Sequence, residues 1–263
     1  MNSWLFPPQT CEVQFDEKWS FVGKKEKHCD PSDPDDDAQG DCWDYIALDP
    51  RSRLVVSARH GKRTGDHVAL LVEDFHRRTE GRLMELMTSD ENPAYAEAIR
   101  TVYGQEVQPQ GKGRRGRQPK PIKQIPKGLT YATVHKTREN NRVVRVEPRL
   151  IYGTIAALVA ALTTSPVSAA VNTVYVERHN GTDRNRNARK VRKTYCFSKD
   201  WEVHEALSYF VLYSYNFCWA VRTLREGNRE EGYQQRTPAM AAKLTDHIWT
   251  LKEWLCYPGV QRK

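Results

Sequence analysis

The sequence predicts a mixed α/β fold in which helices flank a β-sheet. Three segments with alternating apolar and polar residues come first, at 11–22, 42–49 and 53–59. Two helical patterns follow, and a short apolar run at 82–88 lies between them. Strands interspersed with helices along one chain are typical of sheets covered by helices.

The three early segments predict successive antiparallel strands. The first contains the β-forming residues Val13 and Phe15, and Pro50 suits a turn between the second and third. Asp16 and Glu17 are adjacent, so in a strand they point to opposite faces and only one can face a given site. We expect that one to be Asp16, with an acid on a solvated sheet face as the alternative.

Thr64 and Pro93 mark the starts of the two predicted helices. The apolar face of the first consists of Val68, Leu71, Val72 and Phe75. The second is expected to end at Gly104. Asp90 precedes it, at the carboxyl end of the strand-like run, and sites in open α/β sheets are built at such ends. An N-cap role is the alternative for Asp90, and the two roles are compatible.

A long basic segment follows the second helix. Residues 108–127 are rich in glycine, proline and basic residues and contain no acid. Such a composition predicts an inserted loop, and its cations suit contacts with a phosphate backbone. The candidates for these contacts are Arg114, Arg115 and Arg117. A merely solvated loop is the alternative.

The second half of the chain predicts a β-hairpin and helices. Residues 129–135 and 143–151 have the pattern of a β-hairpin insertion. Residues 155–162 predict an Ala-rich buried element, either helix or strand, because periodicity alone does not decide. Residues 201–224 predict a long aromatic-rich helix. It opens a helical C-terminal extension, 201–263, that follows a main domain over 1–200.

Composition favours a partner that is a polyanion. The 263 residues include 41 Lys and Arg against 33 Asp and Glu, which gives a net charge of +8 and a pI near 9.1. Clustered positive charge points to nucleic acid before an anionic membrane. The six cysteines include no C-x-x-C pair, which indicates reduced thiols in a cytoplasm. The long uncharged run at 151–176 contains Pro166, so we expect no transmembrane helix there.

The stretch 171–194 combines one carboxylate, Glu177, with a dense run of cations. Nearby positive charge keeps an acid ionised, which suits a metal ligand. The cations suit phosphates, and a solvated helix face is the alternative. The candidates for phosphate contacts in and near this stretch are Arg178, Asn180, Arg184, Lys193 and Lys199. We expect His179 and His204 to be structural or to contact the nucleic acid backbone.

The element order matches that of the ribonuclease H-like fold, a mixed sheet flanked by helices. In that fold the first and fourth strands are neighbours, so Asp16 and Asp90 can meet, and Glu177 can join them from a later helix. Three carboxylates suit two Mg²⁺ ions, with Mn²⁺ as an alternative ion. One ion activates the attacking oxygen and the other stabilises the leaving oxygen of a phosphoryl transfer.

Several segments closely resemble transposases of the insertion sequence 1 family, and the similarity runs from about Val13 to Leu224. They are FDEKWSFV (15–22), ALD (47–49), GKR (61–63), TSDENPAY (88–95), YGT (152–154), NTVYVERHNGTDR (172–184), RKTYCFSK (192–199) and YNF (215–217). The tail TPAMAAKLTDHIWTL (237–251) also looks like the ending of many such proteins. These motifs are specific as a set, although each alone is weak.

This resemblance implies a D-D-E transposase, with the family's three acids at Asp16, Asp90 and Glu177. Such an enzyme cleaves DNA at transposon ends and transfers the exposed 3′-hydroxyl into target DNA. The implied partners are double-stranded DNA and further copies of the chain bound to it, with no membrane. The implied location is the bacterial cytoplasm, at the nucleoid.

One feature departs from the family. Its members usually begin with a cysteine-rich zinc module and a helix-turn-helix, and this chain starts close to the first predicted strand. We therefore expect either a truncated element, the product of one of two reading frames, or a partner for a separate DNA-binding subunit. Two alternative functions stay open. One is a catalytically inactive DNA-binding relative that regulates or assists a full-length transposase, and the other is a nuclease of the same fold that acts on RNA or structured DNA.

Overall fold

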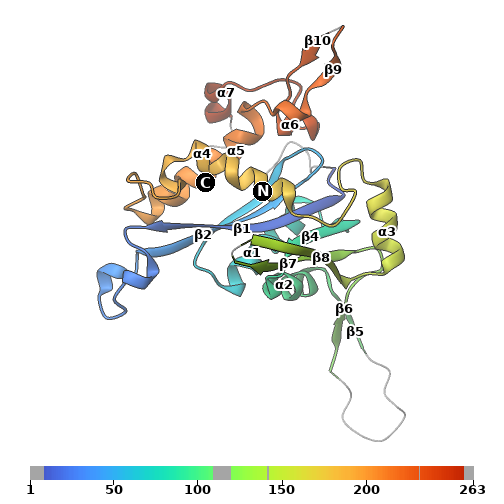
Figure 1. Cartoon of the computed structure of the whole chain (residues 1–263), viewed down its shortest axis with the longest axis horizontal. Helices are drawn as coiled ribbons and strands as arrows, with labels where there is room; N and C mark the ends of the chain where they lie inside the picture. Colours follow the sequence, from blue (N-terminus) through green and yellow to red (C-terminus); the bar gives the residue numbers. More distant parts are fainter. Residues whose placement is uncertain (1–8, 109–119, 141, 231, 258–263) are drawn as a thin grey trace, which may run out of the picture.

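Strand β1 (Glu12–Val22) lies in the middle of a six-stranded mixed sheet. In this computed structural model, the residues described are 9–108, 120–140, 142–230 and 232–257. The sheet has the strand order β3-β2-β1-β4-β7-β8. The remaining strands are β2 (Gly40–Leu48), β3 (Val55–Gly61), β4 (Leu86–Asp90), β7 (Tyr131–Glu139) and β8 (Arg142–Tyr152). The predicted sheet flanked by helices is confirmed (Figure 1).

Strand directions divide the sheet into three parts. β1, β2 and β3 pair antiparallel, as the sequence predicts for the first three strands. β1, β4 and β7 run parallel to one another. β8 closes the sheet as an antiparallel edge strand. The hairpin expected as an insertion is thus the continuation of the main sheet, because β7 pairs directly with β4.

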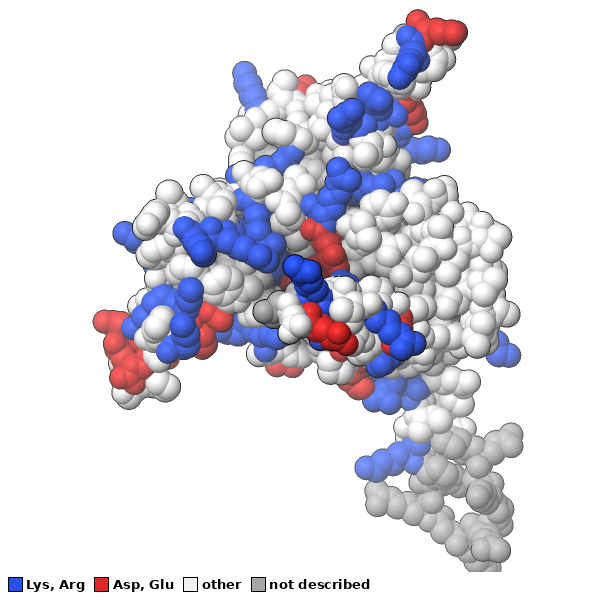
Figure 2. Space-filling view, viewed as in Figure 1, with Lys and Arg blue, Asp and Glu red and all other residues white. Residues whose placement is uncertain are grey.

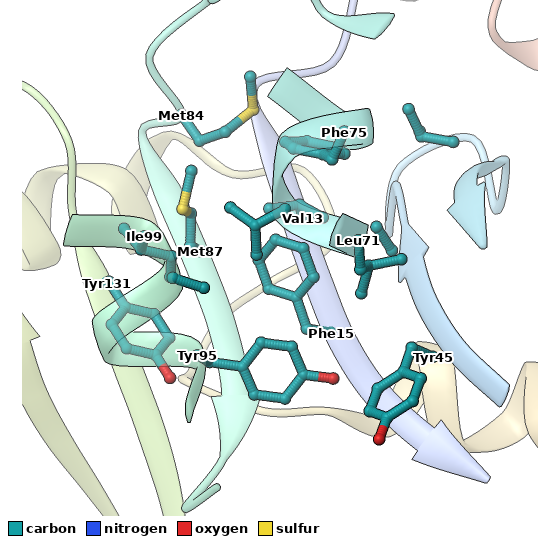
Figure 3. Close-up of a cluster of buried hydrophobic side chains, with 14 of the residues drawn as sticks. Val13, Phe15, Tyr45, Leu71, Phe75, Met84, Met87, Tyr95, Ile99 and Tyr131 are labelled. Carbon is teal, nitrogen blue, oxygen red and sulfur yellow. The ribbon is translucent and has the colours of Figure 1, made fainter. Parts of the chain in front are cut away.

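Helices α1 (Gly65–Arg78) and α2 (Pro93–Tyr103) cover one face of the sheet (Figure 1). The N-caps are Thr64, as predicted, and Asn92, whose side chain accepts from the amide of Ala94. Asn92 therefore takes the N-cap role that was the alternative for Asp90. The apolar face of α1 is buried as expected. It packs with Phe15 and Tyr95, whose rings stack with centroids 5.4 Å apart (Figure 3).

Helices α4 (Val174–Arg186) and α5 (Trp201–Cys218) cover the opposite face. β2 shows the division between faces, since Ala47 packs toward α1 and α2 while Ile46 packs toward α4 and α5. Leu212 and Tyr215 of α5 are part of this second cluster. α5 thus packs on the sheet itself, and it ends at Cys218, earlier than the predicted 224.

The segment expected as a buried helix or strand is helix α3 (Ile155–Thr164), and its expected burial is wrong. Ile155 is 74% exposed, and Ala161 is the one buried residue of the helix. α3 contacts strand β4, but most of its surface is covered by no element of the described chain. The surface over α3 is nearly free of charged side chains in Figure 2.

Shorter elements complete the described chain. β5 (Gln105–Val107) and β6 (Ile122–Gln124) form a two-stranded ribbon where the inserted basic loop begins and ends. The 3-10 helices are η1 (Glu26–His28), η2 (Pro34–Asp36), η3 (Ala188–Lys190) and η4 (Arg222–Leu224). The C-terminal part holds α6 (Pro238–Ala241), α7 (Leu251–Cys256) and the ribbon of β9 (Glu226–Asn228) and β10 (Gly232–Gln234). The expected helical extension thus also contains strands.

One sequence prediction concerns β4 itself. The apolar run was expected as a strand over 82–88, and the strand is Leu86–Asp90. Its register brings Asp90 into the strand as its last residue, opposite Val134 of β7. No helix of the described residues is long and apolar enough to cross a membrane, as expected for 151–176.

Candidate active site

Asp16 and Asp90 lie close together where strands β1 and β4 separate. The parallel pairing of these strands ends at Gln14 and Thr88. Each aspartate therefore stands two residues beyond the last pair. Oxygens of the two carboxylates lie within 4.8 Å of each other. The structure thus brings together the two acids that the sequence placed far apart.

The environment of this pair opposes negative charge. Burial, together with the charges of Asp90 and Glu17, raises the pKa of Asp16 to about 7. Burial also raises the pKa of Asp90. Oδ1 of Asp90 is buried and accepts no hydrogen bond from the described residues. A cation bound here would relieve the charge repulsion and give this oxygen a partner.

Glu17 belongs to the same cluster, although it directly follows Asp16. One of its carboxylate oxygens lies within 4.8 Å of oxygens of both aspartates. Its oxygens accept hydrogen bonds from Asn92 at 3.0 Å, Tyr95 at 3.2 Å and Arg63 at 3.3 Å. The expectation that only one of two adjacent acids faces the site is therefore wrong.

The physical reason is the length of the glutamate side chain. Glu17 leaves β1 on the face that carries Phe15, the face covered by α1 and α2. Its carboxylate reaches the end of that layer, where the strands part. The adjacent Asp-Glu pair was the available signal in the sequence, but Cβ direction alone could not show how far the side chain extends.

The opposite face of β1 is tied to helix α4 by polar contacts. Gln14 accepts hydrogen bonds from the backbone amides of Tyr175 at 3.0 Å and Val176 at 3.1 Å. Asn180 donates from Nδ2 to Oδ2 of Asp16 at 2.7 Å. Asn180 was expected to contact phosphate, but it is only 4% exposed. Its buried amide holds Asp16 and presents no surface to a DNA backbone.

Glu177 stands at the border of the cluster, in the first turn of α4. It accepts a hydrogen bond from Thr173 at 2.7 Å and forms an ion pair with Lys136 of β7. Burial alone would raise its pKa, but these two partners lower it below the ordinary value. The negative charge of Glu177 acts on both Asp16 and Asp90, so it faces the same space.

Glu177 is not one of the three acids whose oxygens lie within 4.8 Å of one another. Its side chain is 46% exposed, and Lys136 occupies one of its oxygens. The charge of Lys136 also acts on Asp90, where it lowers the pKa. This ammonium group therefore lies near both acids and supplies part of the positive charge that a metal ion would bring.

The predicted phosphate contacts occupy different environments. Arg178, Lys193 and Lys199 are exposed, and Arg184 is half-buried. Lys193 has a φ of 58°, in the left-handed region. Arg114, Arg115 and Arg117 lie outside the described residues. Lys and Arg side chains are spread over the face drawn in Figure 2, with smaller groups of acids among them.

The two histidines are buried in the layer of α4 and α5. The ring of His179 packs against Tyr215 with centroids 4.8 Å apart. His204 lies between Ser198 and Ser20, at 2.7 and 3.2 Å. Burial lowers the pKa of each to about 4. Both are therefore neutral at pH 7, which agrees with the structural role expected for them.

A second group of potential metal ligands consists of Cys42, Asp44 and His204. Its chemistry does not suit a metal. Both oxygens of Asp44 already have partners, because His60 contacts one at 2.6 Å and Lys190 the other at 2.7 Å. Burial raises the pKa of Cys42 to about 12, which keeps the thiol protonated. Among the described residues, the cluster around Asp16 is the better cation site.

Comparison with known proteins adds no identification. No protein-family model matches the chain, and no curated protein matches it. Its function is therefore inferred from the arrangement of the sheet, the acids and the cations.

Proposed function

We propose that this chain is the catalytic domain of a metal-dependent enzyme of the ribonuclease H-like class that cleaves and joins DNA. The observation that carries the proposal is the meeting of Asp16 and Asp90 where two adjacent parallel strands part. The strand order and directions, with three antiparallel strands followed by parallel ones, support this fold class. Glu177 approaches from a helix on the other face, as the resemblance to insertion sequence 1 transposases implies.

The residues present fit Mg²⁺. Hard divalent ions prefer carboxylate oxygen, and Asp16, Asp90 and Glu17 offer oxygens within 4.8 Å of one another. Glu177 is the candidate fourth carboxylate, once Lys136 releases it. These residues would hold Mg²⁺, which would supply Lewis-acid chemistry for in-line phosphoryl transfer.

The chain's own residues would orient this site and hold the substrate. Asn180 fixes the orientation of the Asp16 carboxylate through its hydrogen bond to Oδ2. Arg63 and Asn92 hold one oxygen of Glu17, and Tyr95 holds the other. Exposed cations on and after α4, such as Arg178 and Lys199, would hold phosphates of the DNA backbone.

A nicking assay tests the proposal without knowledge of the recognised sequence. Supercoiled plasmid is incubated with the protein in Mg²⁺, Mn²⁺, Ca²⁺ or EDTA. We expect nicking with Mg²⁺ and Mn²⁺ only, and loss of nicking in Asp16→Asn and Asp90→Asn. Asp66→Asn changes an exposed acid of α1 and is the matched control. Nicking that persists in both site variants would refute the assignment of the site.

The transposase function is tested by strand transfer. An oligonucleotide with a labelled 5′ end and a free 3′-hydroxyl is offered together with plasmid, and label joined to the plasmid is measured. Joined product supports a transposase. Nicking without joining favours a nuclease of the same fold, and an assay with RNA would then define its substrate.

The alternative is a catalytically inactive DNA-binding relative. The observation that favours it is Glu177, which pairs with Lys136 instead of joining the other acids. DNA binding without metal-dependent nicking, under all ions tested, would support this second function.

A further inference from the structure

A second feature with the chemistry of a nucleic acid site lies at the far end of α4. It is a groove with a volume of about 580 Å³ between the end of α4, the loop before α5 and the first three turns of α5. This volume is within the roughly 300–1,000 Å³ of ligand sites. The catalytic acids do not line it. We call it the Tyr195 groove.

Two sides of the Tyr195 groove differ in chemistry: the side formed by α5, here called its floor, and the side formed by α4, η3 and the loop before α5, here called its rim. The floor is apolar, since Val203, Leu207 and Val211 project from one face of α5. The rim carries the cations Arg186, Arg189 and Lys199. Asp200 is the single acid of the lining, and its side chain is used as the N-cap of α5, where it accepts from Val203 N at 2.8 Å. One side of the groove is therefore apolar and the other carries positive charge.

Tyr195 stands at this groove with an unused ring. It is 99% exposed, and no described residue stacks on the ring or hydrogen-bonds to its hydroxyl. An aromatic ring that contacts nothing in the fold does not contribute to packing. Exposed aromatic rings among cations are typical of surfaces on which bases of single-stranded nucleic acid stack.

The loop that carries Tyr195 is anchored close by, so the ring is presented from a fixed base. Phe197, two residues later, packs against Phe21 of β1 with centroids 5.1 Å apart. The carbonyl of Ser198 accepts a hydrogen bond from the amide of Gly23 at 2.7 Å. On the other side, the guanidinium group of Arg186 lies 3.3 Å from the centroid of the Trp219 ring. One cation of the rim is thus also held in position.

We infer that the Tyr195 groove binds an unpaired nucleotide of a DNA strand. The base stacks on Tyr195 above the apolar floor, and the flanking phosphates contact Arg189 and Lys199. An unpaired base has two apolar faces and a charged backbone, which matches the two parts of the groove. A fully paired duplex cannot present a base in this way. This inference rests on the proposed function, because it assigns the groove to the same DNA.

The distance to the candidate active site sets where this nucleotide lies. Arg186 follows Glu177 by nine positions on the same helix, which corresponds to about 14 Å along its axis. Phosphates of one DNA strand are about 3.4 Å apart along a B-form helix. Asn180, which contacts Asp16, lies six positions before Arg186, or about 9 Å along the axis. The groove therefore lies about three to four nucleotides from a phosphate at the acids. Strand ends that fray or carry an unpaired extension would reach it.

A fluorescence titration tests the inference. Duplexes with and without a four-nucleotide single-stranded extension are labelled with 2-aminopurine in the extension or at the matching paired position. We expect the extended duplex to bind more tightly, and its fluorescence to fall on binding because the base stacks. Tyr195→Ala should weaken binding of the extended duplex about five-fold or more and abolish the fluorescence change. Tyr195→Phe should retain both.

The matched control is Tyr233→Ala, which removes another exposed tyrosine on β10. Equal behaviour of Tyr195→Ala and Tyr233→Ala toward the extended duplex would overturn the inference, while the proposed function would stand. If neither form of DNA binds to the wild-type protein, the proposed function itself fails. Since the Tyr195 ring is 99% exposed and stacks on no described residue, its removal should not unfold the protein, and circular dichroism checks this.

Cys196 supplies an independent readout in the unaltered protein. It is exposed and lines the same groove. Bound single-stranded DNA should slow its alkylation by iodoacetamide, while exposed Cys256 in α7 reacts at an unchanged rate. Peptide mass spectrometry separates the two. An unchanged rate at Cys196 under saturating DNA would place the strand elsewhere and overturn the inference.

Discussion

The side-chain amide of Asn180 donates a 2.7 Å hydrogen bond to Oδ2 of Asp16, and it couples helix α4 to the central strand. The hydrogen bonds at Gln14 and at Asp16 can form together because their partners are spaced alike along the strand and along the helix. Two residues along a strand span about 6.6 Å. Four residues along a helix, from Val176 to Asn180, span about 6 Å. Strand and helix therefore stay in step over both contacts.

The first prediction follows from this contact. Asn180→Ala should lower metal-dependent nicking or apparent Mg²⁺ affinity about 10- to 100-fold, as is typical when a group that orients a ligand is lost. Mg²⁺ titrations of the nicking rate measure this. Asn185→Ala, an exposed residue of the same helix, is the matched control. If Asn180→Ala leaves the nicking rate and the apparent Mg²⁺ affinity unchanged, the hydrogen bond from Asn180 is not needed to orient Asp16.

The second prediction concerns Glu177. Glu177→Gln should reduce nicking more than about 100-fold, because the charge of the proposed fourth metal ligand is lost. Loss of a residue that only orients a ligand has a smaller effect. DNA affinity, measured by a mobility shift, should change little. Glu73→Gln alters an exposed glutamate of α1 and controls for charge. If nicking and DNA affinity fall together, Glu177 is a binding residue and not a catalytic one.

The third prediction is a pH dependence of stability in the absence of metal. The pKa of Asp16 is about 7 in the folded protein, against an ordinary value of 3.8. The folded state therefore binds the proton more tightly than the unfolded state does. The contribution of Asp16 to stability is fully present below pH 3.8 and is lost as the pH rises toward 7.

Removing the negative charge of Asp16 should therefore increase the stability of the folded protein at high pH only. In EDTA at pH 8, Asp16→Asn should be more stable than the wild type by roughly 2–4 kcal/mol, and the difference should shrink toward pH 4. Urea denaturation at a series of pH values measures it, with Asp66→Asn as the control. A gain that is equal at every pH would show that the carboxylate is not destabilised by its surroundings.

Local sequence patterns predicted most of the fold. The alternation of apolar and polar residues predicted β1. Successive side chains of this strand point to opposite faces, so Phe15 lies on the face covered by α1 and α2 and Asp16 on the face covered by α4. Thr64 and Pro93 marked helix starts because capping depends on a few neighbouring residues. The predicted burial of α3 was wrong because burial depends on which elements pack over the helix, and an apolar composition does not determine this.

The candidate site was predicted less completely, for related reasons. Asp16 and Asp90 could be paired because strand order fixes which ends are neighbours. Asn180 was expected on the surface because its neighbours in sequence are basic, yet it lies on the face of α4 that turns toward β1. Because of strand alternation, Glu17 was not expected in the site. Alternation describes the directions of the Cβ atoms and not where a longer side chain ends.

The last prediction concerns the buried charges that hold α4 on the sheet. Lys18 of β1 is fully buried and forms ion pairs with Asp183 of α4 and, at 3.2 Å, with Asp44 of β2. Lys190 also pairs with Asp44, at 2.7 Å. Two lysines thus face two aspartates in an interior that water does not reach. Removal of one cation leaves a buried carboxylate without compensation.

Lys18→Met should accordingly destabilise the protein by about 3–5 kcal/mol, measured by urea denaturation at pH 7. The exposed Lys27→Met should cost almost nothing. Adding Asp183→Leu to Lys18→Met should recover much of the loss, since apolar pairs often replace buried ion pairs without penalty. Asp183 lies three residues after Asn180, so nicking by the double variant reports whether packing alone keeps α4 in register with Asp16. Full nicking would assign these charges to stability only, whereas weak nicking in a stable double variant would show that they position the site.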